Sequence, residues 1–221
     1  MRQKTGKIRI LCYGDSNTFG YIAGNGGRYD RHTRWPGLLQ EFLGEAFQVF
    51  EAGMCGRTTA FEDQTEPGRN GLEKVDGAVK AHKPLDLLIF MLGSNDCQVQ
   101  YQLSAPEIAN GMEQVLQKAQ KSNSSEAKVL LIAPAAMTER IAGSGFGSNF
   151  DAHSVEMSKE LAREYEALAK RQECDFLDGT KVTRVSETDG LHLDAQGHKM
   201  LAEAVSEWVK RQKWNLPGEQ G

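Results

Sequence analysis

The stretch over residues 10–18 constrains the fold most, because an apolar run stops abruptly at a glycine and small polar residues follow it. Residues 7–13 show little alternation between apolar and polar side chains, which is typical of a strand covered on both faces of a sheet. In an open α/β sheet, ligands bind outside the carboxyl ends of the strands. Ser16, two residues beyond Gly14, is therefore a candidate nucleophile that needs a base, an orienting acid and an oxyanion hole.

Strand-like and helix-like segments alternate along the whole chain. Apolar runs predict strands over residues 7–13, 47–50, 85–92, 128–133 and 174–177. Helical spacing and end signals predict helices over residues 35–43, 71–82, 104–121, 153–172 and 194–213. We therefore expect a single domain over residues 1–221, an α/β protein with three layers and about five mainly parallel strands.

The overall composition disfavours several function classes. The 26 basic and 30 acidic residues leave a net charge of -4 and form no long run of one sign, which disfavours nucleic acid and anionic membranes as partners. No apolar stretch reaches the roughly 18 residues of a membrane span, and residues 1–7 lack an apolar signal core, so we expect a soluble, cytoplasmic protein. The four cysteines include no Cys-x-x-Cys pair, which disfavours a zinc site or a redox dithiol.

The motif Asp189-Gly-Leu-His192 can supply the missing base and orienting acid. A carboxylate three residues before an imidazole can fold back in one turn, accept a hydrogen bond from the ring and stabilise the imidazolium. Alone, the pattern is more typical of a turn-capping aspartate and a surface histidine.

Polar turns after the second and third expected strands favour the catalytic interpretation of Asp189 and His192. Gly56 can bring a backbone N–H close to a substrate, and Asn95 can aim its side-chain amide at the same point. With the N–H of Ser16 they would provide three donors for an oxyanion.

Taken together, Gly14-Asp15-Ser16-Asn17, Gly56, Gly93-Ser94-Asn95-Asp96 and Asp189-Gly-Leu-His192 resemble, in order and spacing, the motifs of the SGNH (GDSL-type) hydrolases. The resemblance implies a flavodoxin-like three-layer fold and a serine esterase without metal or organic cofactor. It implies Ser16 as nucleophile, His192 as general base and Asp189 as orienting acid. It also implies an oxyanion hole made of the Ser16 N–H, the Gly56 N–H and the Asn95 side chain.

Within this superfamily, Arg57-Thr58-Thr59 and the segments 10–16 and 91–96 are similar to those of the arylesterase and acyltransferase branch. That similarity implies hydrolysis of short-chain, acetyl-type esters, with acyl transfer to alcohols as an additional reaction. A carbohydrate O-deacetylase or a lysophospholipase-type esterase is the alternative within the superfamily. Apolar residues on the loop 19–34 also favour a homo-oligomer.

A set of residues on the expected loops are candidates for the substrate pocket: Asp15, Asn17, Trp35, Met137 and Phe146, and, with them, Phe19, Tyr21 and Phe150. Packing in the core or in a loop is an equally good interpretation of each aromatic residue and of Met137. Asp15 and Asp96 can instead structure their loops by accepting backbone hydrogen bonds.

Two other function classes stay open at this point. A metal-dependent phosphoesterase could use Asp15, Asp96, Asp189 and His192 around a divalent ion, although no His-x-His or Asp-x-His pair follows the first strand. A catalytically silent module that binds carbohydrate or acyl groups would be expected to lack one of the motifs above.

Overall fold

A five-stranded sheet is the middle layer of the computed structural model, which describes residues 6–64, 66–124 and 126–214. The strands are β1 (Ile8–Gly14), β2 (Phe47–Gly53), β3 (Leu87–Met91), β4 (Lys128–Ala133) and β5 (Asp175–Asp178). Their order is β2-β1-β3-β4-β5, and every neighbouring pair is parallel. The predicted sheet is thus confirmed, with the strand order of a flavodoxin-like fold.

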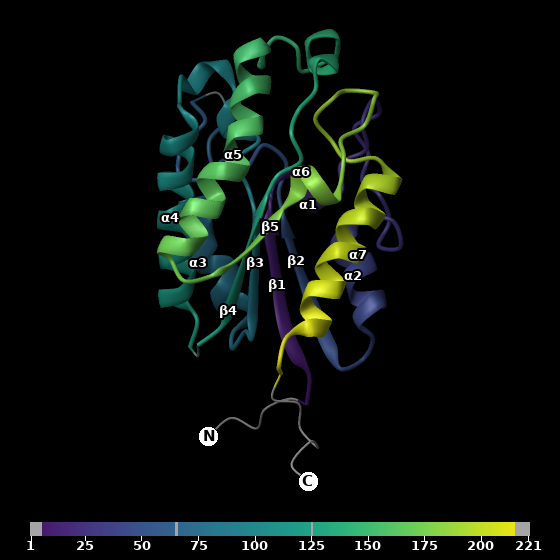
Figure 1. The fold of residues 1–221 in the computed structure, drawn as a ribbon, viewed down its shortest axis with the longest axis vertical. Coiled ribbons are helices and arrows are strands. Elements are labelled where there is room, and N and C mark those ends of the chain that lie inside the picture. The colour runs from purple at the N-terminus through teal and green to yellow at the C-terminus, as the bar shows by residue number, and fades with distance from the viewer. Residues whose placement is uncertain (1–5, 65, 125, 215–221) are drawn as a thin grey trace.

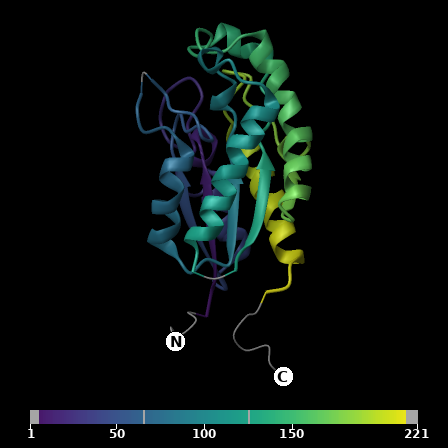
Figure 2. The same ribbon diagram turned by 90° about the vertical axis from the view of Figure 1, so that its left-hand side faces the viewer.

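Helices cover both faces of this sheet (Figure 1 and Figure 2). The principal helices are α2 (Trp35–Leu43), α3 (Gly71–His82), α4 (Ala105–Ser122), α5 (Ala152–Arg171) and α7 (Ala195–Arg211). In Figure 1, α2 and α7 lie on the right of the sheet and α3, α4 and α5 on the left. The expected three layers are therefore confirmed.

The two helical layers divide the side chains of each strand between two cores. In β1, Ile10 and Cys12 pack on the side of α2 and α7, whereas Leu11 and Tyr13 pack on the side of α3, α4 and α5. The same alternation continues in β3 and β4, because successive side chains of a strand point to opposite faces. Burial on both faces explains why these strands are almost uniformly apolar in sequence.

Local end signals fix the helix positions. Ser104 and Glu107 form a capping box at the start of α4, and the Asp194 side chain accepts a hydrogen bond from the Gly197 N–H at the start of α7. Short helices lie where only loops were expected: α1 (Ser16–Phe19), α6 (Gly179–Val182), η1 (Asn95–Cys97), η2 (Val99–Tyr101) and η3 (Glu139–Gly143), the last three being 3₁₀ helices.

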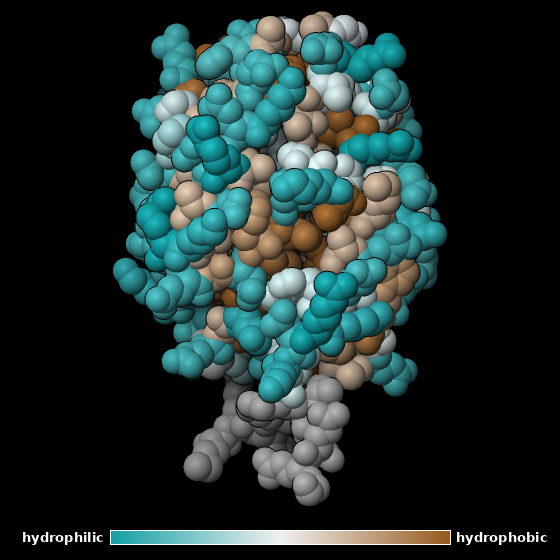
Figure 3. Space-filling view, viewed as in Figure 1, coloured by the Kyte–Doolittle hydropathy of each residue, from teal (hydrophilic) through white to brown (hydrophobic). Residues whose placement is uncertain are grey.

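Strand β5 is an edge strand, and its surroundings are the most apolar part of one face. Figure 3 shows hydrophobic side chains gathered between α5 and α7, where Phe176 and Leu177 of β5 are only partly buried against the two cores. In the described part of the chain, no helix has the length and hydropathy needed to cross a membrane. The first five residues, part of the segment without an apolar signal core, lie outside the described ranges.

The strand order brings the polar motifs together. β1 lies between β2 and β3, so the chain leaves the sheet toward opposite neighbours at the carboxyl ends of β1 and β3. Ser16 follows the end of β1, and Asn95 follows the end of β3. This is the point at which such folds bind ligands.

Candidate active site

The turn that carries Ser16 is held by its own backbone and by Asp15. A Cβ atom at Gly14 would lie 2.0 Å from the Thr18 hydroxyl and 2.7 Å from the Met91 carbonyl oxygen, so only glycine fits at the end of β1. The Asp15 side chain accepts a hydrogen bond of 2.9 Å from the Asn17 N–H and thereby caps α1. Ser16 is the first residue of α1 and is 6% exposed.

His192 contacts both other members of the expected triad. Its Nε2 atom lies 3.0 Å from Ser16 Oγ, and its Nδ1 atom lies 2.7 Å from Asp189 Oδ2. The second carboxylate oxygen of Asp189 accepts hydrogen bonds from the N–H groups of Leu191 and His192, at 3.0 and 2.9 Å. The Asp-x-x-His motif therefore folds back within one turn, as its spacing predicts.

The partners of Asp189 determine its charge and the tautomer of His192. Burial by itself raises the pKa of Asp189, but the hydrogen bonds from the His192 ring, the His192 N–H and the Leu191 N–H outweigh it and lower the pKa below its usual value. An ionised carboxylate only accepts hydrogen bonds, so His192 Nδ1 carries the proton that it donates to Asp189. The neutral ring then presents Nε2 as an acceptor to the Ser16 hydroxyl.

Asn17 links the serine turn to the histidine loop. Its side-chain oxygen accepts a hydrogen bond of 2.8 Å from the Leu193 N–H, and its side-chain amide donates to the Leu191 carbonyl at 3.3 Å. These two bonds bracket His192 in the chain. Asn17 therefore connects segments 176 residues apart, a role different from the pocket lining that we expected.

The three candidate oxyanion donors come from different loops. Gly56 has φ of +75°, a left-handed conformation that favours glycine, and a Cβ atom there would lie 3.2 Å from the Arg69 side chain, which would have to shift slightly. One N–H of the Asn95 amide donates to the Arg57 carbonyl at 3.0 Å, which leaves its second N–H for a substrate. Within the described ranges, no acceptor is bonded to the backbone N–H of Ser16 or Gly56.

The two aspartates considered as metal ligands are engaged with their own loops. Asp96 is fully buried, and both of its carboxylate oxygens accept hydrogen bonds from Thr59, which fastens the Gly56 loop to η1. Burial raises the pKa of Asp15 and of Asp96 to about 6. Across residues 6–64, 66–124 and 126–214, the His, Cys, Asp and Glu side chains form no group of three or more that could hold a metal ion.

Aromatic side chains surround the imidazole. The Tyr21 ring lies 4.3 Å from the His192 ring between centroids, and the Phe146 ring lies 5.2 Å from it. Of the pocket candidates, Phe146 is thus beside the site. Tyr21 is close to His192 because Gly20 ends α1 in the left-handed region and turns the chain back.

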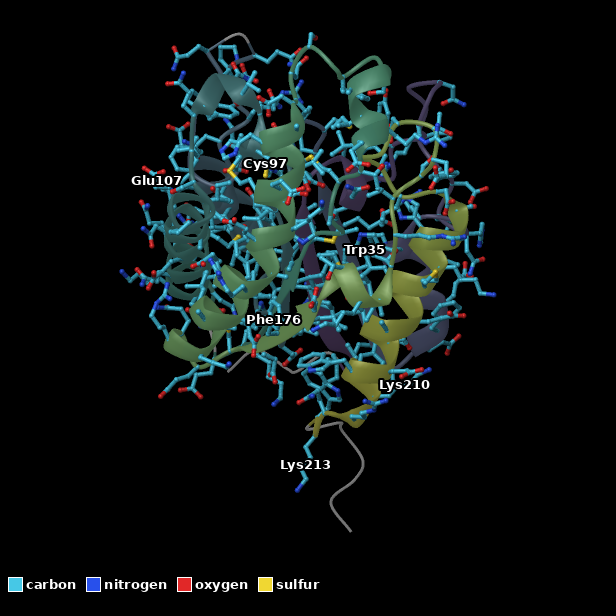
Figure 4. All side chains as sticks on the ribbon, turned by 45° about the horizontal axis from the view of Figure 1, so that its top comes forward. Trp35, Cys97, Glu107, Phe176, Lys210 and Lys213 are labelled. Carbon is cyan, nitrogen blue, oxygen red and sulfur yellow. The ribbon has the colours of Figure 1, made fainter. Side chains whose placement is uncertain are left out.

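Two pocket candidates are not at a substrate-accessible surface. Trp35 is 0% exposed and lies in the core between the sheet and the layer of α2 and α7 (Figure 4), where its backbone N–H donates to His198 Nδ1 at 3.3 Å. Met137 is 2% exposed in the opposite core. Both were pocket candidates because they border long loops, but Trp35, the first residue of α2, and Met137, between β4 and η3, pack in the cores.

The sequence interpretation gave no role to Arg57, which lies beneath the site. Its guanidinium is buried and donates to the carbonyl of Gly14 at 2.7 Å and to that of Ala52. A basic residue in a polar loop carries no sequence signal that it will fold inward. The resemblance of Arg57-Thr58-Thr59 to the arylesterase branch singled the residue out but assigned it no contact or role.

A family model for the GDSL-like Lipase/Acylhydrolase family matches residues 12–200. The chain belongs to this family. No curated protein matches the chain significantly.

Solved structures of this GDSL-like fold agree with the assignment. An aryl esterase from M. smegmatis is 31% identical, with a TM-score of 0.87 over 92% of this chain and 98% of that one. Est24, a carbohydrate acetylesterase from Sinorhizobium meliloti, has the same identity and TM-score over 92% and 99% of the two chains. A putative arylesterase from Agrobacterium tumefaciens is 32% identical, with a TM-score of 0.84 over 92% and 98%. The GDSL-like protein is therefore a carboxylic ester hydrolase.

Proposed function

We propose that this esterase hydrolyses short-chain, acetyl-type carboxylic esters through an acyl intermediate on Ser16. The observation that carries the proposal is the continuous hydrogen-bonded path from Ser16 Oγ through the two nitrogens of His192 to Asp189, with distances of 3.0 and 2.7 Å. Such a path is the geometry needed to activate a serine hydroxyl.

In the first step, Ser16 Oγ attacks the ester carbonyl carbon while its proton passes to His192 Nε2. The imidazolium that forms keeps its Nδ1–H on the ionised carboxylate of Asp189, which stabilises the new charge. His192 then gives its proton to the leaving alcohol as the carbon–oxygen bond of the ester breaks. Acyl-Ser16 remains on the enzyme.

In the second step, water attacks the acyl carbon while His192 Nε2 accepts its proton. The bond between the acyl carbon and Ser16 Oγ then breaks as His192 returns the proton to Ser16, and the carboxylic acid is released. The oxygen of each tetrahedral intermediate would be held by the N–H groups of Ser16 and Gly56 and by the second amide hydrogen of Asn95. Losing one such donor typically reduces the rate about 100- to 1,000-fold. An alcohol in place of water would give acyl transfer with the same proton movements.

Support for a short acyl group comes from the neighbours and from the surroundings of His192. Structures 31% identical to this chain are named as an aryl esterase and as a carbohydrate acetylesterase. Tyr21 and Phe146 pack on the imidazole and restrict the space beside the nucleophile. A carbohydrate O-acetyl ester is accordingly the second candidate substrate.

The test is hydrolysis of p-nitrophenyl acetate, butyrate and octanoate by the wild type and by Ser16→Ala. The variant should lose on the order of 1,000-fold or more in kcat/KM while remaining folded, and the wild type should prefer acetate. Equal rates in the two proteins would overturn Ser16 as the nucleophile. If EDTA abolishes the activity and a fluorophosphonate does not label Ser16, the metal-dependent phosphoesterase is supported instead.

Further measurements separate the finer alternatives. The rates of hydrolysis of acetylated sugars and of aryl acetates at equal concentration distinguish a carbohydrate deacetylase from an arylesterase. Release of fatty acid from a lysophospholipid would favour the lysophospholipase alternative. Formation of an alcohol acetate in water measures acyl transfer. Light scattering tests the homo-oligomer expected from the loop 19–34, because a monomer would contradict it.

A further inference from the structure

Arg57 is a buried cation next to the site that the mechanism above does not use. The residue is 7% exposed, although arginine is almost never buried unless paired. Its Cζ atom lies 4.2 Å from the centroid of the Tyr13 ring, and one of its terminal nitrogens donates to the carbonyls of Gly14 and Ala52. The Nε atom has no hydrogen-bond partner among the described residues.

The two carbonyls mark the exits of neighbouring strands. In the parallel pair of β1 and β2, Gly14 is aligned with Gly53, one residue beyond Ala52. From Gly14 the chain enters the turn of Ser16, and from the end of β2 it enters the loop of Gly56. A single guanidinium therefore connects the end of β1, two residues before the nucleophile, to the end of β2, four residues before a candidate oxyanion donor.

The main chain of the same residue holds the remaining donor. The Arg57 carbonyl accepts the hydrogen bond of 3.0 Å from the Asn95 amide, and Arg57 directly follows Gly56. Its side chain and backbone thus contact all three segments that carry the donors for an oxyanion.

Stability alone is a poor explanation for this arrangement. Desolvating a charged group costs free energy, and well-packed apolar residues often replace buried ion pairs without loss. Burial lowers the pKa of Arg57, opposed by the charges of Tyr13 and Asp15, yet a guanidinium remains protonated at neutral pH. A planar cation with several donors can bridge two carbonyls in a fixed geometry, which an apolar side chain cannot do.

We propose that Arg57 is a positioning residue that sets the Gly56 N–H and the Asn95 amide at the correct distance from Ser16. Its side chain bridges the Gly14 and Ala52 carbonyls, and its backbone carbonyl accepts a hydrogen bond from the Asn95 amide. The proposal rests on the proposed function, because it assigns Arg57 to the oxyanion hole of that reaction.

Arg9, on strand β1, offers a matched control. Its guanidinium also donates to backbone carbonyls, those of Pro84 and His82, and its Cζ atom lies 4.6 Å from the centroid of the Phe50 ring. It lies at the amino-terminal end of the sheet, away from the site. Arg9→Met therefore removes the same kind of interaction without touching the donors.

The experiment compares kcat and KM for p-nitrophenyl acetate in Arg57→Met and Arg9→Met, with melting temperatures for both. We expect Arg57→Met to lower kcat about 100-fold, the size of one lost oxyanion donor, with little change in KM. Arg9→Met should lose stability and keep its kcat. Equal kcat in Arg57→Met and the wild type, or equal losses in the two variants, would overturn the proposal.

A double-mutant cycle with Asn95→Ala distinguishes positioning from general destabilisation. If Arg57 acts through the oxyanion donors, Arg57→Met should cost less than about tenfold in the Asn95→Ala background, because residues that act through one unit are not additive. The same 100-fold loss in both backgrounds would contradict the proposal. Should Arg57→Met fail to fold, Arg57→Lys is carried through the same cycle, with the same criterion.

Failure of this proposal can be told apart from failure of the proposed function. An inactive Ser16→Ala together with a fully active Arg57→Met would overturn only the role of Arg57. A fully active Ser16→Ala would overturn the function itself, whatever Arg57→Met does.

Discussion

Two carboxylates near the contact between Ser16 and His192, those of Asp189 and Asp15, are equally buried but differ in their hydrogen-bond partners. Asp189 is 3% exposed and Asp15 is 1% exposed. Asp189 accepts three hydrogen bonds, one of them from the imidazole. Asp15 accepts one hydrogen bond at Oδ1 from the Asn17 N–H, and its Oδ2 atom is buried without a hydrogen-bond partner among the described residues.

The difference in partners gives opposite shifts in pKa. For Asp15, desolvation outweighs the backbone hydrogen bonds and the charges of His192 and Arg57, which lower the pKa, and the pKa rises to about 6. For Asp189 the hydrogen bonds exceed the desolvation, and the pKa falls. Burial alone therefore does not determine the charge of a carboxylate; the number of donors aimed at it does. Asp189 is equipped to stabilise an imidazolium, and Asp15 is equipped to cap a helix.

The largest predicted effect is the loss of kcat on substitution of Asp189, compared with the same substitution of Asp15. Asp189→Asn should reduce kcat on the order of 10,000-fold, because an amide in this position favours the wrong tautomer of the histidine. Asp15→Asn retains an oxygen for the Asn17 N–H and should lose less than about tenfold. Steady-state kinetics with p-nitrophenyl acetate measure both. Comparable losses in the two variants would contradict the distinction between them.

The sequence predicted the positions of these carboxylates and offered a different role for each, but it did not predict the opposite shifts of their pKa values. Periodicity and end signals located α3 and β4 at their observed bounds, because a buried parallel strand and an amphipathic helix each have a pattern of their own. The order of the motifs led to the expectation that Ser16, Asp189 and His192 meet. The hydrogen-bond partners of a carboxylate depend on how loops fold, and no local pattern carries that information.

Residues at the ends of elements were the hardest to assign. Trp35 follows a long loop and was a candidate for the pocket, yet it is the first residue of α2 and its side chain packs in the core. Arg57 faces inward because two strand-end carbonyls lie within reach of it. Both placements follow from tertiary packing, which overrides the polar or exposed character of the surrounding loop.

The predicted effect of intermediate size is the pH dependence of the free energy of unfolding, to which the two carboxylates contribute with opposite signs. In the unfolded chain the pKa of an aspartate is about 3.9, so with a folded pKa near 6 Asp15 binds more protons in the folded state between about pH 4 and pH 6. Its contribution to the free energy of unfolding therefore decreases as the pH rises through this window, by up to about 3 kcal/mol. Asp189, with a lowered pKa, contributes stability above its unfolded pKa that is lost as the pH falls.

Chemical denaturation of the wild type and of Asp15→Asn at several pH values isolates this contribution. Asp96, with a pKa near 6, adds to the same trend, and His198, whose pKa burial lowers to about 4, opposes it. Both groups are present in both proteins, so the difference between the two curves belongs to Asp15. A difference independent of pH would show that Asp15 has the same pKa folded and unfolded.

The smallest predicted effect concerns Asn17, which joins the two carboxylate regions. Asn17→Ala leaves the buried Leu193 N–H without its acceptor, which should cost about 1 to 2 kcal/mol in the free energy of unfolding. Because Leu193 follows His192 directly, the imidazole should also shift relative to Ser16, and kcat should fall about tenfold. Denaturation and steady-state kinetics measure the two quantities.

Asn25 provides the matched control for this link. Its side-chain oxygen accepts a hydrogen bond of 2.8 Å from the Gly27 N–H, but both residues belong to one exposed turn. Asn25→Ala should therefore leave kcat unchanged. If Asn17→Ala also leaves kcat unchanged while losing stability, the histidine loop holds its register without Asn17, and the hydrogen bonds of Asp189 alone fix the imidazole. A loss of kcat in Asn17→Ala alone would show that the alignment of the two regions depends on the bond between them.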